Sequence, residues 1–258
     1  MSRRDDINKL YKPSQQFGEF CRIVFWGNCV FSVISIFASG LFFNVLSVLQ
    51  IASALIFVTS SLVDDGLFWY DAESERRKNS VQNAFGVRFS ELETDGYYNN
   101  AISPSILKYA MNSFESNYFS KFIAGKMLAK SAIKSIVAIV LLISVGWVIS
   151  DGSILLAVSQ AVFSAYVIED TVLLAIFVVR LNKLYDEAYS TLVTTGIHRP
   201  QQIVYLLLYC VEYESIKAHY KVRLDSKLFS KYNPELSEKW EKIASEIVVE
   251  LSDEEMKI

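Results

Sequence analysis

The sequence predicts an all-α integral membrane protein with two transmembrane helical hairpins, four spans in all, and a helical cytoplasmic domain. Three observations lead to this fold class. The 258 residues are 52% hydrophobic and 14% aromatic, and their mean hydropathy is +0.27. Four apolar segments approach or exceed the length needed to cross a bilayer, since a helix rises about 1.5 Å per residue. Short turns without cations alternate with long polar regions, and every Lys and Arg lies in these regions or where they join the apolar segments.

The first predicted hairpin, residues 21–70, follows a polar N-terminal arm at 1–20. Its helices are Cys21–Phe43 and Val45–Val63, joined by a turn at Gly40–Asn44. Polar residues recur at spacings of 3 and 4 in the first helix, which puts them on one narrow face. Such a face suits close packing between membrane helices, which we favour, or a pore lining. The candidate residues of the hairpin are Asn28, Ser32, Ser35, Ser39, Gln50, Ser53 and Asp64.

The second predicted hairpin, residues 133–179, contains the segment around which the fold is organised, Ile154–Val179. This segment carries two adjacent acids, Glu169 and Asp170. A carboxylate near the bilayer centre costs about 2.5–3.5 kcal/mol, which the surrounding Ile, Leu, Val and Phe residues roughly offset. We therefore expect the helix to insert as half of a hairpin, with its acids sheltered by protein. They form a candidate intramembrane acidic site, with either a structural or a working role.

A faint internal repeat relates the two hairpins. Leu62-Val63-Asp64-Asp65 resembles Val167-Ile168-Glu169-Asp170, and each acidic pair lies in the second helix of its hairpin. Asp64 and Asp65 come at the far end of their helix. We therefore expect them to be solvated at the cytoplasmic face.

The central insert, residues 71–132, is predicted to form two helices. The first, Ala72–Phe85, ends at Gly86, a residue type that favours the helix C-cap. The second begins at Ser103-Pro104. Its apolar residues share one face, which we expect to pack on the C-terminal region rather than lie on the inner membrane surface. They are Leu107, Met111, Phe114, Tyr118 and Phe122.

The tail, residues 180–258, continues the fourth apolar helix through Tyr185 to a break near Gly196. Ile203–Val211 is too short to span a bilayer and predicts a core helix. Asn233-Pro234 predicts the start of a last amphipathic helix. Insert and tail together are large enough for a small cytoplasmic domain.

The distribution of cations predicts the orientation. Neither short turn, Gly40–Asn44 or Ser150–Ser153, contains a Lys or Arg. The positive-inside rule then places both termini and the insert in the cytoplasm. We expect a multi-pass protein of the bacterial inner (plasma) membrane.

Several function classes find no support in the sequence. A net charge of −3 gives no basic surface for direct nucleic-acid binding. Cys21, Cys29 and Cys210 have no metal-ligand or disulfide spacing, and His198 and His219 form no zinc motif. Phosphate-binding glycine loops and a nucleophile elbow are missing from the sequence. We predict no enzymatic activity, no metal and no cofactor.

The order of hairpin, helical insert, hairpin and tail resembles four-helix transmembrane effectors of bacterial antiphage defence systems, CBASS-type or retron-associated. The stretch Arg76-Arg77-Lys78-Asn79-Ser80-Val81-Gln82-Asn83-Ala84-Phe85 is similar to the charged helix after the first hairpin in those proteins. The resemblance implies a toxin of an abortive-infection system that disrupts the inner membrane when triggered. It also implies a homo-oligomer in the lipid bilayer and a trigger from the same operon, either a cytoplasmic sensor protein or a signalling nucleotide.

Two other functions remain open from the residues alone. A small ion-coupled transporter or channel subunit would use Glu169 or Asp170 as a proton or cation site. A membrane scaffold would recruit a partner through the insert and tail, and the acids would then have no role.

Overall fold

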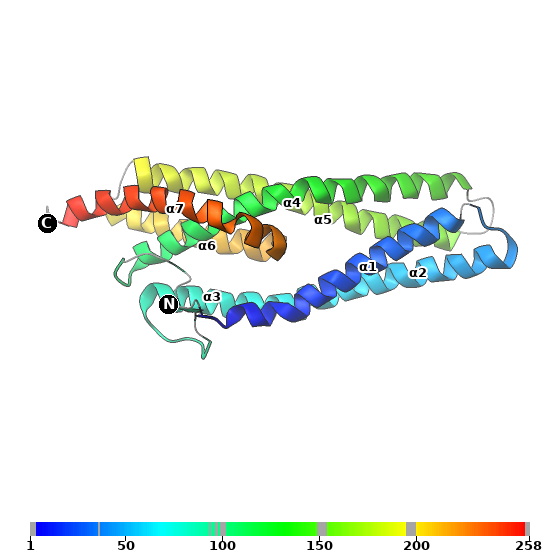
Figure 1. The fold of residues 1–258 in the computed structure, drawn as a ribbon, viewed down its shortest axis with the longest axis horizontal. Helices are drawn as coiled ribbons and strands as arrows, with labels where there is room; N and C mark the ends of the chain where they lie inside the picture. The colour runs from blue at the N-terminus through cyan, green and yellow to red at the C-terminus, as the bar shows by residue number, and fades with distance from the viewer. Residues whose placement is uncertain are drawn as a thin grey trace. The chain divides into compact units, whose positions relative to one another are not determined.

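The computed structural model describes residues 4–35, 37–92, 94–95, 98, 102–148, 154–194 and 200–255. Side chains at 4–5, 95, 145–148, 154–162, 194, 200–201 and 248–255 lie outside this description. So do the predicted turn at 150–153 and the predicted break near Gly196. The described chain is almost entirely helical, as the sequence predicts (Figure 1).

The elements of the fold are long helices joined by short connections. Gly86, with a φ of +68°, ends α3 and donates its N–H to the Gln82 carbonyl, so the predicted C-cap is confirmed. Two short strands, β1 (Arg4–Asp5) and β2 (Thr94–Asp95), pair antiparallel. The helices are η1 Ile7–Leu10, α1 Tyr11–Ser35, α2 Gly40–Val63, η2 Asp64–Phe68, α3 Trp69–Phe85, α4 Ile106–Val148, α5 Ile154–Tyr189, η3 Ser190–Thr194, α6 Pro200–Tyr220 and α7 Ser226–Glu255.

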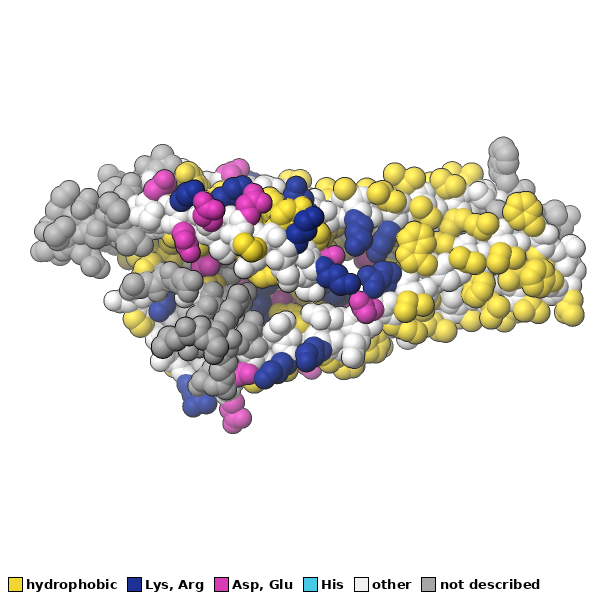
Figure 2. All heavy atoms as spheres, in the orientation of Figure 1, with side chains coloured by type: hydrophobic (Ala, Val, Ile, Leu, Met, Phe, Trp, Pro, Cys, Tyr) yellow, Lys and Arg dark blue, Asp and Glu magenta, His cyan; other side chains and the backbone are white. Residues whose placement is uncertain are grey.

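Three helical stretches among the described residues are long and apolar enough to cross a membrane. They are Ile7–Ser35, Gly40–Phe85 and Ile106–Ser144, with mean hydropathies of 1.3, 2.2 and 1.9 over their most apolar windows. Their surfaces carry many exposed apolar side chains, such as Ile23, Val48 and Ile143. Figure 2 shows such side chains covering a broad area of the face in view. These helices therefore have the composition of bilayer spans.

The chain divides into two compact units. The first, here called the hairpin unit, consists of Asn8–Glu73 and Ala129–Val172. Its core is built around Phe163, whose ring centroid lies 5.5 Å from that of Phe25 and 5.1 Å from that of Phe57. Phe163 is fully buried. Aromatic packing therefore joins α1, α2 and α5 into one bundle, and Ala138 and Leu141 of α4 complete it.

The second unit, here called the helical unit, consists of Met1–Ile7, Ser74–Leu128 and Leu173–Ile258. Its core is centred on Phe114 of α4, which is fully buried. The Phe114 ring lies 4.9 Å from Tyr185 of α5 and 5.3 Å from Trp240 of α7. The predicted packing of the insert's apolar face on the C-terminal region is therefore confirmed.

Several helix boundaries differ from the prediction, and the first helix begins at Tyr11 rather than Cys21. The first helix ends at Ser35 rather than Phe43, because residues 37–39 form a turn and Gly40, with a φ of +60°, begins α2. The second insert helix and the third apolar segment form one helix, α4, with no break at 132. The last helix begins at Ser226 and contains Pro234 in its interior. Phe229 packs in a tilted geometry against Phe119 of α4, and Tyr232 packs edge-to-face against Phe122. These contacts stabilise the turns before the proline.

The predicted core helix at Ile203–Val211 is longer and only half covered. It belongs to α6, which buries Leu206, Tyr209 and Cys210. The opposite face leaves apolar side chains exposed by 43% to 67% of their area. These residues, here called the α6 apolar face, are Ile203, Val204, Leu207, Leu208 and Val211.

We predict that Asp225→Ala destabilises the helical unit by about 1 kcal/mol, which lowers the thermal midpoint by a few degrees. The Asp225 carboxylate caps α7 by accepting hydrogen bonds from the N–H groups of Lys227 (2.9 Å) and Leu228 (3.2 Å). Asp225→Asn keeps an acceptor and should retain most of the stability. Circular dichroism of the detergent-solubilised chain measures both midpoints, and an equal loss in the two variants would contradict the capping role.

Candidate functional site

A buried polar seam joins α1 and α2 inside the hairpin unit. We define the polar seam as Asn28 and Ser32 of α1 with Gln50 and Ser53 of α2. The Asn28 amide donates to the Gln50 carbonyl at 3.0 Å and to the Ser53 hydroxyl at 2.7 Å. The Ser32 hydroxyl donates to the Gln50 side-chain oxygen at 3.0 Å. Asn28, Ser32 and Gln50 are fully buried. The seam therefore satisfies its polar groups between the two helices.

Two other predicted residues of this face do not join the seam. The Ser35 hydroxyl bonds to the Ser32 carbonyl of its own helix at 2.8 Å. Ser39 is exposed at the N-cap of α2, because α1 has already ended. The spacing pattern is therefore valid only up to the point where the helix stops.

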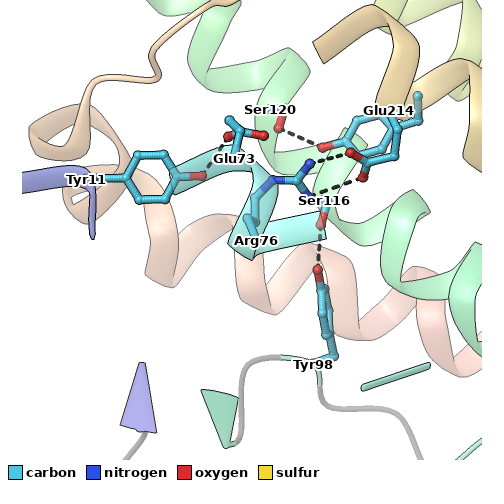
Figure 3. Close-up of polar contacts among 8 residues, drawn as sticks. Tyr11, Glu73, Arg76, Tyr98, Ser116, Ser120 and Glu214 are labelled. Carbon is cyan, nitrogen blue, oxygen red and sulfur yellow. Dashed lines mark hydrogen bonds and ion pairs between the residues drawn. The ribbon is translucent and has the colours of Figure 1, made fainter. Parts of the chain in front are cut away.

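Asp64 lies in an environment different from the predicted one. It begins the π-helical turn η2 and is 3% exposed, so the expectation of a solvated acid is wrong for this residue. Its carboxylate accepts a hydrogen bond from the Ser14 hydroxyl at 3.0 Å. Two turns later, buried Glu73 accepts a bond from the Tyr11 hydroxyl at 2.7 Å (Figure 3). A π-helical turn changes which residues face the neighbouring helix. In η2, the residue that faces α1 is Asp64.

Glu169 and Asp170 are exposed on α5. The expectation that the single chain shelters them is therefore wrong. Asp170 interacts electrostatically with Lys134 of α4, which also interacts with Lys130 and Arg22. The acids thus lie near the cations of the hairpin unit.

Hydroxyl groups between α4 and α5 fix the register of the two helices near Glu169 and Asp170. Ser164 donates to the Ala138 carbonyl and Ser135 to the Val167 carbonyl, both at 3.2 Å. The Ser131 and Thr171 hydroxyls lie 2.7 Å apart. Glu169 and Asp170 therefore lie at the level of 131–135, where the apolar segment of α4 begins. Sequence reasoning missed this set, although spacings of four on α4 and seven on α5 are the helical signal for it.

A second polar cluster lies in the helical unit around Arg76 of α3. Its guanidinium pairs with Glu214 of α6, with Nη1 3.2 Å from Oε1 and a second bond from Nη2 to Oε2 (Figure 3). The two side chains are 17% and 14% exposed. Neighbouring Tyr213 lies 3.3 Å from the Ser120 hydroxyl, and burial raises the pKa of the Tyr213 phenol. Arg76 lies in the charged stretch singled out in the sequence, but its partner is 138 residues away.

The contacts in these clusters are aromatic packing, hydrogen bonds and an ion pair. Burial raises the pKa of the Cys210 thiol to about 12, so this cysteine stays protonated at neutral pH. Among the described residues, no group of three His, Cys, Asp or Glu side chains is arranged to hold a metal ion.

Comparison of the chain with protein-family models, with curated proteins and with solved structures gives no match.

We predict that Asn28→Ala lowers the stability of the hairpin unit by about 0.6–1.7 kcal/mol, the range measured for hydrogen bonds between membrane helices. The variant removes the donor that serves both Gln50 and Ser53. Ser47→Ala is the matched control, since the Ser47 hydroxyl bonds only to the Phe43 carbonyl of its own helix, at 2.9 Å. Thermal unfolding in detergent should separate the two variants. Equal midpoints would contradict an interhelical role for the seam.

We predict that Arg76→Ala destabilises the helical unit by about 3–5 kcal/mol, because it leaves the Glu214 carboxylate buried without its guanidinium. The double variant Arg76→Met/Glu214→Leu removes both charges and should recover much of this loss. Denaturant unfolding of the wild type, Arg76→Ala and the double variant measures the three free energies of unfolding. If the double variant were less stable than Arg76→Ala, the ion pair would not be what links α3 to α6.

Proposed function

We propose that the chain is a membrane-embedded effector that makes the bacterial inner membrane leak when a trigger acts on its helical unit. The observation that carries this proposal is the pair of exposed carboxylates on α5, within a hairpin whose surface is otherwise largely apolar. Carboxylates are costly against lipid, so these acids need water or a protein partner. In a conducting assembly they would lie where its water-filled path opens.

We further propose four spans, formed by α1, α2, α4 and α5, with both termini in the cytoplasm. The three apolar helical stretches support this topology, and α5 is the fourth partner of the same bundle. The cations Arg22, Lys130 and Lys134 support a cytoplasmic border at the level of Glu169 and Asp170. On this arrangement the acids lie at the mouth of the membrane region rather than at its centre.

The conduit in this proposal is an oligomer. One bundle uses its seam residues within the α1–α2 hairpin, so those side chains are not available to line a path inside a single chain. A ring of Glu169 and Asp170 from several copies would attract cations to the mouth of a pore. The α6 apolar face supports self-association, because contiguous exposed apolar patches often mark interaction sites.

The trigger in this proposal acts through the helical unit. The resemblance to antiphage effectors suggests a cytoplasmic sensor protein or a signalling nucleotide from the same operon. The polypeptide supplies a route for such a signal, because α4 and α5 continue unbroken from the hairpin unit into the helical unit.

A small ion-coupled transporter or channel subunit is the second candidate. The electrostatic interaction of Asp170 with Lys134 favours it, since paired acids and cations near a membrane border are typical of proton and cation relays. Such a protein would move a defined ion without arresting growth.

We predict that the wild-type chain, expressed together with the neighbouring genes that would supply its trigger, depolarises bacterial cells. Glu169→Gln/Asp170→Asn should slow this depolarisation about tenfold by removing the charge that concentrates cations. A voltage-sensitive dye measures the rate at matched membrane levels. The control is Asp186→Asn/Glu187→Gln, which neutralises another exposed acidic pair on α5. This control should depolarise like the wild type.

Each alternative gives a different result in the same assay. Equal depolarisation by all three proteins would exclude the acidic pair as the working site. Ion movement without growth arrest would favour the transporter. No depolarisation and no ion movement, even with the neighbouring genes of the operon present, would contradict the effector proposal.

A further inference from the structure

A basic surface lies on the helical unit where α4, α7 and the connection between α6 and α7 meet. We define the basic surface as Lys126 of α4, Lys221 and Arg223 of the connection, and Lys227 and Lys231 of α7. All are exposed except Arg223, which is half-buried. The sequence between 217 and 231 holds five cations and one acid. From this surface we infer a docking site for the anionic headgroups of membrane lipids.

Direct contacts hold the basic surface together. The connection touches α4, because the Asp225 N–H lies 3.3 Å from the Met127 sulfur. The Tyr232 ring is 5.3 Å from Phe122, and the Lys126 ammonium lies 5.2 Å from the Phe122 ring and 5.7 Å from the Tyr232 ring. Lys231 lies 5.3 Å from the Tyr232 ring. Cations therefore alternate with aromatic rings from two helices, the composition that proteins place at a membrane interface.

The acids near this surface already have partners within the protein. Asp225 caps α7 through two backbone N–H groups. Glu235 accepts a hydrogen bond from Lys239 at 2.7 Å. The five cations of the surface outnumber Asp225, so its net charge is positive, although the chain as a whole carries −3.

The connection begins with one of these cations in a left-handed backbone conformation. Lys221 follows α6 with a φ of 48°, the region that glycine or asparagine usually occupies at this position.

The position of Lys126 on α4, close to the apolar segment of that helix, is the reason for inferring a lipid partner. Ile133, where the apolar segment of α4 begins, follows seven residues later, about 10 Å along the helix. Residues 116–150 contain no Asp or Glu. Clusters of four to eight Lys or Arg beside a transmembrane helix are typical sites for anionic headgroups. This inference rests on the proposed crossing of the membrane by α4, but not on ion leakage.

The test compares lysine reactivity in two lipid environments. The full chain is placed in nanodiscs of phosphatidylcholine alone or with about 30% phosphatidylglycerol, and treated with an amine-acetylating reagent. Mass spectrometry then gives the labelling of each lysine. We expect labelling of Lys126, Lys227 and Lys231 to fall about threefold or more with phosphatidylglycerol. In 1 M NaCl, where charges are screened beyond about 3 Å, this protection should disappear.

Internal controls are available on the same chain. Lys183 and Lys242 have side chains 71% exposed and lie outside the basic surface, so their labelling should not change. In Lys227→Gln/Lys231→Gln, protection of Lys126 should weaken, whereas Lys183→Gln/Lys242→Gln, which leaves the Lys239 partner of Glu235 in place, should retain it. A role limited to folding would not produce this difference between two double variants at exposed lysines.

Three outcomes would overturn the inference. Equal labelling of Lys126, Lys227 and Lys231 in the two kinds of nanodisc would exclude an anionic headgroup site. Protection in pure phosphatidylcholine by inorganic phosphate would assign the surface to a small soluble anion. Protection there by an RNA oligonucleotide would assign it to nucleic acid. Because none of these readouts measures ion flow, failure here and failure of the effector proposal are distinguishable.

Discussion

The hairpin unit depends on one constraint: a polar side chain between apolar helices needs a hydrogen-bonding partner there. Asn28 and Gln50 meet this constraint across α1 and α2, and Ser135 and Ser164 meet it across α4 and α5. Leucine in the same places would pack but would not select a register, since apolar surfaces slide at little cost. Phe163 packs against Phe25 and Phe57 in the apolar core of the same unit. The hydrogen bonds therefore set the register, and the aromatic core supplies the bulk of the contact.

The same constraint explains how much of the fold the sequence predicts. Helix type and the α1 face follow from periodicity, because Asn28 and Ser32 are one turn apart and Gln50 lies in the next apolar segment. Periodicity does not identify hydrogen-bond or ion-pair partners that lie far apart in the sequence. Nothing near Arg76 identifies Glu214, since the pair exists only once α3 and α6 have packed. The exposure of Glu169 was not predictable for the same reason: it depends on which face of α5 meets α4.

Helix boundaries show a competition between local signals. Pro234 favours a helix start, but Asp225 offers a cap nine residues earlier. Phe229 and Tyr232 decide between them, because their contacts with α4 stabilise the turns that precede the proline. A similar competition occurs at η2, where Gly66 lies in a π-helical turn between two regular helices. Tertiary contacts select among local options that the sequence leaves nearly equal in free energy.

The repeated acidic pairs show how one sequence pattern acquires two roles. In η2, the π-helical turn directs Asp64 toward Ser14 and buries it, so this carboxylate acts in packing. In α5 the helix stays regular, Thr171 and Val167 face α4, and Glu169 and Asp170 are exposed. The hydrogen bond from Ser14 makes Asp64 part of the packing between α1 and η2. Glu169 and Asp170 are exposed on the single chain and are therefore accessible to groups outside it. This contrast, rather than the acidic pattern itself, is the reason for proposing the working site on α5 rather than in the first hairpin.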